Sequence, residues 1–165
     1  MCRQRDSRRQ RRGSQRCAGG GCRSMSGIVV GTDGSPNSRR ALEWAVREAG
    51  LRRTPLTVVT VCQDVAGFWG TPVPCDPSGE HVTQARKETE EVTDKIIEET
   101  GARRPASVSV RALSGVPAEV LIAESEAADM VVVGSRGTGG FARLLLGSVA
   151  NQVVHHAHCT VVVIP

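Results

Sequence analysis

The residues best suited to chemistry are glycines near the C-terminal end of the chain. Gly134 and Gly137 follow the apolar run 131–133, and Gly147 stands directly before Ser148. Glycines at the end of a strand let the backbone approach a ligand closely and turn its N–H groups inward. A Gly-Ser pair that opens a helix offers further unpaired N–H groups to an anion. The segment therefore predicts a site for a phosphorylated ligand.

Alternating strands and helices are predicted to position this segment. The expected strands span residues 28–32, 56–62, 107–113, 129–134 and 160–164, and the expected helices span 36–50, 81–100, 118–127 and 148–156. The strands are continuous valine and isoleucine runs without period-two alternation, which indicates a parallel sheet covered by helices on both faces. We expect a doubly wound, Rossmann-like α/β domain whose five parallel strands lie in the order 3-2-1-4-5.

This strand order predicts where a ligand binds. In an open α/β sheet the ligand lies at the carboxyl ends of the strands, where the winding direction reverses, and here that point falls between the first and fourth strands. The turns that meet there are 31–34 and 134–147. We therefore expect these two glycine-rich turns to converge on one site.

Two other nucleotide-binding motifs are excluded by particular residues. A phosphate-binding loop of the Walker type needs a lysine after its glycines, and the chain has no lysine beyond Lys95. A dinucleotide fingerprint placed on residues 137–142 lacks the acidic residue expected about 20 positions later. Residues 155–164 contain no acid at all.

The first 24 residues differ in composition from the rest of the chain. They carry eight of the 21 basic residues, all arginine, and a single acid. The remaining residues have 13 basic and 16 acidic side chains, hence a formal charge of −3 against +4 for the whole chain. A segment like 1–24 buries too little apolar surface to fold. We expect it to be a disordered extension, with Met25 as the true translation start and residues 25–165 as one domain.

Composition also argues against several classes of protein. Residues 1–24 have neither an apolar face nor aromatic side chains that stack on bases, so we expect no nucleic-acid partner. With no secretion signal and no apolar run of about 18 residues, we expect no membrane partner and a cytoplasmic location. The odd set Cys62, Cys75 and Cys159 and the crowded segment 155–159 both lack metal-binding spacing.

The glycine spacing resembles a known motif. Gly134-x2-Gly137-x9-Gly147-Ser148 matches G-x2-G-x9-G-(S/T), the ATP-binding motif of the universal stress protein family. Residues 28–35 are similar to the family's first strand and acidic turn, and residues 155–165 are similar to its end. The resemblance covers residues 27–165 and departs at Thr160, where many members have proline.

The resemblance implies binding of an adenine nucleotide, ATP, either alone or together with Mg²⁺. The implied contacts are Gly31, Thr32 and Asp33 at the nucleoside, Val61 at the adenine, Val133, Gly134, Arg136 and Gly137 at the ribose and phosphates, and Gly147, Ser148 and Val149 at the β- and γ-phosphates. The Asp33 carboxylate could accept from a ribose hydroxyl or help to hold the metal, and Arg136 offers a fork of donors to phosphate. Ligand-free interpretations stay open: a capping turn for Asp33, a solvated side chain for Arg136 and a helix N-cap for Ser148.

The implied function is binding more than catalysis. Apart from Asp33, the matched residues include no obvious general base, so hydrolysis should be slow or absent and we assign no catalytic residue. The resemblance implies a nucleotide-responsive regulator in the stress response. A slow ATPase of the same fold and a ligand-free dimer module are the alternatives. Family members commonly dimerise through the last strand, so we expect a homodimer through Thr160 to Ile164.

Overall fold

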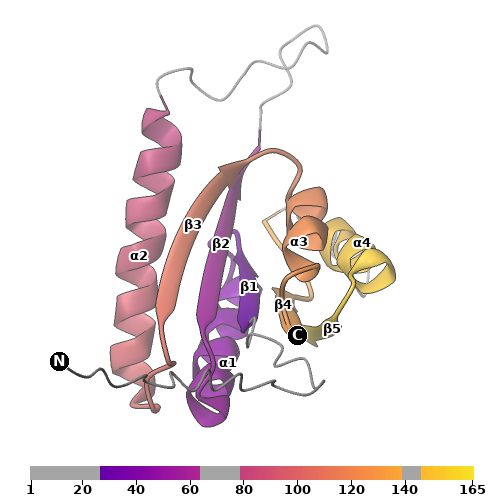
Figure 1. Cartoon of the computed structure of the whole chain (residues 1–165). Helices are drawn as coiled ribbons and strands as arrows, with labels where there is room; N and C mark the ends of the chain where they lie inside the picture. Colours follow the sequence, from indigo (N-terminus) through magenta and orange to yellow (C-terminus); the bar gives the residue numbers. More distant parts are fainter. Residues whose placement is uncertain (1–26, 64–78, 139–145) are drawn as a thin grey trace, which may run out of the picture.

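The structure has the predicted sheet. The computed structural model describes residues 27–63, 79–138 and 146–165, so the expected N-terminal extension lies outside the described residues. The described chain forms β1 (Ile28–Thr32), α1 (Pro36–Arg52), β2 (Leu56–Cys62), α2 (Glu80–Thr100), β3 (Val108–Ser114), α3 (Pro117–Ser125), β4 (Met130–Gly134), α4 (Ser148–His156) and β5 (Thr160–Ile164). Neighbouring strands all run parallel, in the order β3-β2-β1-β4-β5 (Figure 1). The doubly wound α/β fold is confirmed.

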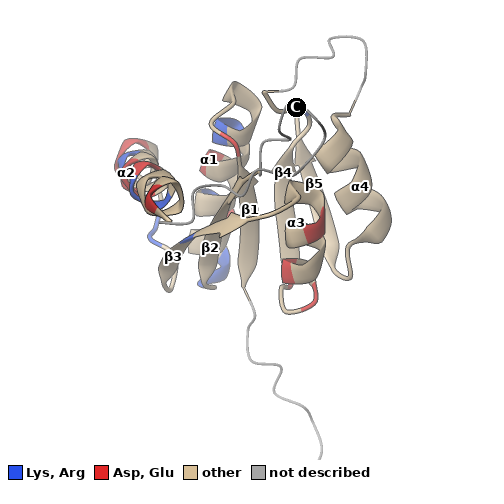
Figure 2. Cartoon of the chain, turned by 90° about the horizontal axis from the view of Figure 1, so that it is seen from above, with Lys and Arg blue, Asp and Glu red and all other residues tan. Residues whose placement is uncertain are grey.

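Helices cover both faces of the sheet. In Figure 2, α1 and α2 lie on one side of the strands, and α3 and α4 lie on the other. Along β1, Ile28 and Val30 belong to the core beneath α1 and α2, whereas Val29 belongs to the core beneath α3 and α4. Because both faces are buried, successive strand residues are apolar, which explains the continuous valine runs. Within the described ranges, no helix is long and apolar enough to cross a membrane.

The end of α1 corrects the prediction that the helix stops at Gly50. The helix continues to Arg52 and ends at Arg53, whose φ of 55° lies in the left-handed region. Gly50 is buried within the helix, and a Cβ atom at this position would overlap the carbonyl oxygen of Arg103. This glycine therefore allows α1 to approach the segment before β3 closely and does not end the helix.

Candidate functional site

The first predicted turn, 31–34, and the described start of the second, 134–138, meet at the carboxyl ends of β1 and β4, while residues 139–145 of the second turn lie outside the described residues. These strands pair directly, with Ile28 beside Met130 and Val30 beside Val132, so the turns that follow them leave the sheet side by side. The Asp33 carboxylate then joins the two turns: its Oδ2 atom accepts a hydrogen bond from the Thr138 N–H at 2.9 Å. The site thus forms at the point where the winding direction of the sheet reverses.

Asp33 is held as an ionised hydrogen-bond acceptor. Its Oδ1 atom accepts from the Ser35 N–H at 3.0 Å, while Oδ2 accepts from Thr138. Partial burial raises the pKa of the Asp33 carboxyl, but hydrogen bonds from Ser35, Thr138 and Ser38 together outweigh it and hold the pKa below its ordinary value of 3.8. Because a carboxylate can accept about four hydrogen bonds, Asp33 keeps capacity for further donors.

The cap of α1 is Ser35, not Asp33. The Ser35 Oγ atom accepts from the Ser38 N–H at 3.2 Å, and Pro36 occupies the first helical position. Asp33 therefore does more than form a turn before a helix, because it also fastens the 134–138 loop to β1.

Gly134 is required by the packing of the protein backbone, and Gly137 makes room for the Asp33 side chain. A Cβ atom at Gly134 would lie 2.8 Å from the carbonyl carbon of Asn37 and 2.9 Å from the nitrogen of Ser38. A Cβ atom at Gly137 would overlap the Asp33 carboxylate. Both glycines allow the 134–138 loop to lie directly against the turn between β1 and α1.

Gly147 differs from the other two glycines. A Cβ atom there would make only ordinary contacts, the nearest being the Arg136 Cα at 3.5 Å and the Ser135 carbonyl oxygen at 3.6 Å. Its φ of −69° is open to any residue. Among the described residues, neither packing nor backbone conformation gives a reason for glycine at position 147.

The N-terminus of α4 carries no side-chain cap. Gly147 is the N-cap residue, so the interpretation of Ser148 as the N-cap is wrong: Ser148 is the first helical residue, and its side chain is exposed. The first turn also contains no acidic residue. Within the part of the chain that the structure describes, the first N–H groups of α4 and the positive end of its dipole are thus available to an anion.

The other predicted contact residues divide into exposed and buried ones. Arg136 is exposed and forms no ion pair with any residue of the described ranges. Val133 is 3% exposed, and Val61 and Val149 pack against the same core, so Val133 can offer a ligand little beyond its backbone. A Cβ atom at Gly31 would lie 2.8 Å from the Leu121 Cδ1 atom, which gives this glycine a packing role beneath α3.

Sequence reasoning missed the polar residues that hold the loop in place. Asn37 donates from Nδ2 to the Ser135 Oγ at 3.1 Å, and the Ser35 hydroxyl donates to the Arg136 carbonyl at 3.4 Å. Their positions in the first turn of α1 were the available signal, since this turn adjoins the predicted crevice.

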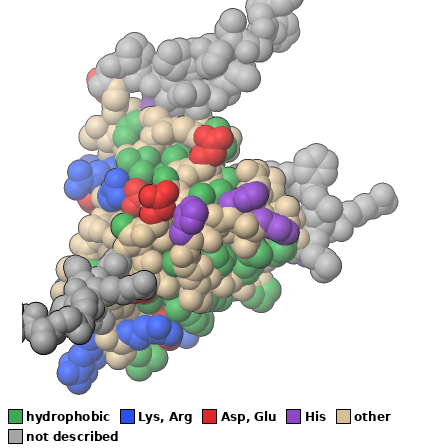
Figure 3. Space-filling model, turned by 45° about the vertical axis from the view of Figure 1, so that its right-hand side comes forward, with side chains coloured by type: hydrophobic (Ala, Val, Ile, Leu, Met, Phe, Trp, Pro, Cys, Tyr) green, Lys and Arg blue, Asp and Glu red, His purple; other side chains and the backbone are tan. Residues whose placement is uncertain are grey.

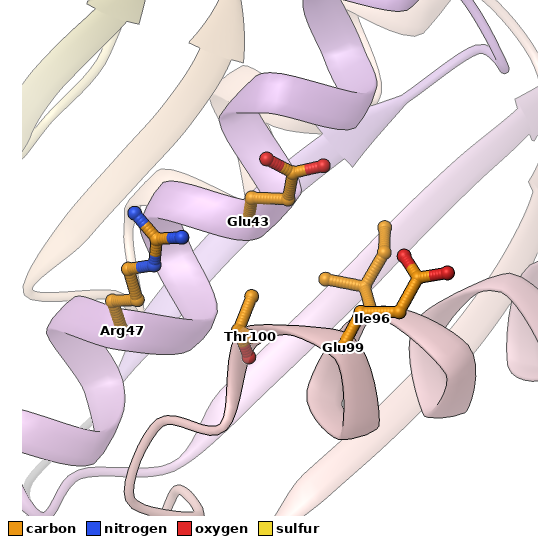
Figure 4. A pocket seen from close by; sticks show the side chains of 5 residues that line it. All are labelled: Glu43, Arg47, Ile96, Glu99 and Thr100. Carbon is orange, nitrogen blue, oxygen red and sulfur yellow. The ribbon is translucent and has the colours of Figure 1, made fainter.

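A hollow between α1 and α2 lies away from the two glycine turns. It measures about 130 Å³ and is lined by Glu43, Arg47, Ile96, Glu99 and Thr100 (Figure 4). Ligand pockets usually span roughly 300–1,000 Å³, so it is too small for a nucleotide. Arg39 bridges the two helices beside it, donating to Glu43 at 3.4 Å and to Glu99 at 2.9 Å. These contacts give the charged residues a role in helix packing.

Histidines near the C-terminus, His155, His156 and His158, are exposed on the surface. Figure 3 shows histidine side chains gathered on the surface, and the ring centroids of His155 and His156 are 6.4 Å apart. Among the residues that the structure describes, no group of three or more His, Cys, Asp and Glu side chains could hold a metal ion.

Fold and site together define a doubly wound α/β domain in which two glycine-containing turns meet at the carboxyl ends of β1 and β4. The sequence model of the Universal stress protein family matches residues 25–165. A universal stress protein of Mycobacterium tuberculosis is 38% identical over 143 residues, which cover 86% of this chain and 48% of that protein. The chain therefore belongs to the universal stress protein family, and it spans about half the length of the curated relatives it matches.

Two solved structures of the family with bound nucleotides share the fold. The universal stress protein from Archaeoglobus fulgidus in complex with dAMP is 28% identical, covers 84% of this chain and 97% of its own, and has a TM-score of 0.58. A universal stress protein in complex with cAMP is 25% identical, covers 83% of this chain and 94% of its own, and has a TM-score of 0.58.

Proposed function

We propose that this domain binds ATP in the crevice between β1 and β4 and acts as a nucleotide-responsive regulator. The observation that carries the proposal is the N-terminus of α4, where no described residue fills the space beside Gly147 and no described side chain caps the helix. Packing against the described residues gives no reason for glycine there, whereas a phosphate group that approaches the backbone does. The dAMP and cAMP complexes of the two relatives support an adenine nucleotide as the ligand.

The charges of the crevice favour one orientation of the nucleotide. The ionised Asp33 repels phosphate oxygens, but it can accept hydrogen bonds from ribose hydroxyls or help to hold Mg²⁺. Arg136 and the N-terminus of α4 attract phosphate oxygens instead. We therefore place the nucleoside near residues 31–33 and Val61, and the phosphates between Arg136 and Ser148.

The same residues favour binding over hydrolysis. Asp33 is the only acid in the described turns 31–34 and 134–138, and the low pKa of its carboxyl makes it a weak base. Its partly exposed carboxylate is the observation that keeps a slow ATPase as the second candidate. If ATP is bound but rarely hydrolysed, the regulatory state of the protein depends on whether ATP occupies the site. It does not depend on how fast products are released.

Native mass spectrometry and phosphate release together test this function. We expect the purified protein to bind ATP and to release phosphate more slowly than about once per minute, far below the roughly ten per second of a typical enzyme. Steady turnover well above that rate would favour the ATPase. No bound nucleotide and no thermal shift with millimolar ATP would favour a ligand-free module.

We also propose that the chain forms a homodimer through β5. This strand lies at the edge of the sheet, beside β4 alone in the described chain, and an uncovered edge can pair with a second copy. Light scattering at micromolar concentration should give twice the chain mass. A mass equal to one chain would contradict the dimer.

A further inference from the structure

The first turn of α1 and the turn before it hold the 134–138 loop in place by hydrogen bonds. Three hydrogen bonds cross between them: from Asn37 to the Ser135 Oγ, from the Ser35 hydroxyl to the Arg136 carbonyl, and from the Thr138 N–H to Asp33. The bond from Asn37 is the one that reaches a side chain of the loop. It therefore fixes the loop through the Ser135 side chain as well as through the backbone.

Arg40 fixes the orientation of the Asn37 amide. Its Nη2 atom donates to the Asn37 Oδ1 at 2.8 Å. Because a guanidinium only donates hydrogen bonds, the amide oxygen must face Arg40, and the amide nitrogen is left to face the Ser135 Oγ at 3.1 Å. The chemistry of Arg40 thus makes Asn37 the donor to Ser135.

Ser135 connects this amide to the N-terminus of α4. Ser135 is 9% exposed, and its carbonyl oxygen accepts from the Gly147 N–H at 2.7 Å. Its own N–H donates to the Ile164 carbonyl at the end of β5 at 2.6 Å. Every polar group of Ser135 is therefore engaged, and its carbonyl bonds directly to the residue at which the candidate phosphate site begins.

We propose that Asn37 is a positioning residue for the phosphate half of the site. Through Ser135 it holds the 134–137 backbone and the N-cap of α4 at a fixed separation, without touching the ligand itself. The proposal rests on the proposed function, because it assigns a role within the ATP site. It predicts that removing the Asn37 side chain lowers the affinity for the phosphates of ATP and leaves the affinity for the nucleoside unchanged.

A double-mutant cycle read with two ligands tests this role. Asn37→Ala, Ser135→Ala and the double variant are titrated with ATP and with adenosine, and their thermal unfolding is followed. We expect each single variant to bind ATP about fivefold more weakly, the equivalent of one net hydrogen bond, and the double variant to be no weaker than either single one. Adenosine affinity should change by less than about twofold.

Arg39→Ala is the matched control, because Arg39 lies in the same part of α1 but pairs with Glu43 of α1 and Glu99 of α2 instead of with the loop. It should leave both affinities unchanged. An equal loss of ATP and adenosine affinity in Asn37→Ala would indicate a merely structural role and overturn the inference. If the wild-type protein binds ATP and Asn37→Ala binds it with the same affinity, the inference is overturned as well. A wild-type protein that binds neither ligand would overturn the proposed function as well as this inference.

Discussion

Replacing Gly147 by alanine should weaken ATP binding about 100-fold and leave the fold intact. Among the described residues the new methyl group has room, its nearest neighbour there being the Arg136 Cα at 3.5 Å. It would stand on the surface that we assign to the phosphates, at the N-terminus of α4. Displacing a phosphate from those N–H groups loses one or two hydrogen bonds to a charged group, each about 1.5–3 kcal/mol.

The stability of the Gly147→Ala variant should stay close to that of the wild type. Alanine at a compatible φ restricts the unfolded chain and stabilises by about 0.4–1 kcal/mol, whereas alanine is a poorer N-cap than glycine by a similar amount. The free energy of unfolding should therefore change by less than about 1 kcal/mol. Calorimetric titration with ATP and urea unfolding provide the two readouts. Wild-type affinity for ATP in this variant would contradict the assignment of phosphates to α4.

Replacing Gly134 by alanine should, unlike Gly147→Ala, greatly lower the free energy of unfolding. The added Cβ would lie 2.8 Å from the carbonyl carbon of Asn37 and 2.9 Å from the nitrogen of Ser38, and both are backbone atoms that cannot rotate away. Overpacking of this kind costs about 1–3 kcal/mol. Since domains are stable by only about 5–15 kcal/mol, the loss should be plain in urea unfolding.

Gly147→Ala is the matched control for Gly134→Ala, because both add one methyl group to a glycine of the same motif. Equal stability of the two variants would show that the 134–138 loop can move away from α1, contrary to the close packing described above. Reduced ATP binding in Gly134→Ala would carry no separate meaning, since the loop itself would be displaced.

The elements could be predicted from the sequence because their signals are local. Continuous valine runs mark buried parallel strands, and Ser35-Pro36 marks the start of α1. Gly50 misled the prediction because the carbonyl that requires a glycine there belongs to Arg103, far away in the chain. A glycine that permits a long-range approach looks, in sequence, the same as one that ends a helix.

The candidate site shows the same limit. Spacing alone treats Gly134, Gly137 and Gly147 as equivalent. The structure separates them: Gly134 lies against backbone, Gly137 lies against the Asp33 side chain, and Gly147 makes only ordinary contacts with the described residues. The contact between Asn37 and Ser135 joins residues 98 positions apart, and no local pattern indicates it. The fold was therefore predictable from residue types, but the way in which the loop is held was not.

The most direct test of the account is to map the amide signals of the isotope-labelled protein by NMR while ATP is added. We predict that the largest shifts fall on Arg136, Gly137, Ser148 and Val149, with smaller shifts at Asp33. The control region is the hollow between α1 and α2, represented by Arg47 and Thr100, whose signals should not move. Shifts centred on that hollow, or no shifts at saturating ATP, would contradict the central claim that the crevice between β1 and β4 holds the nucleotide.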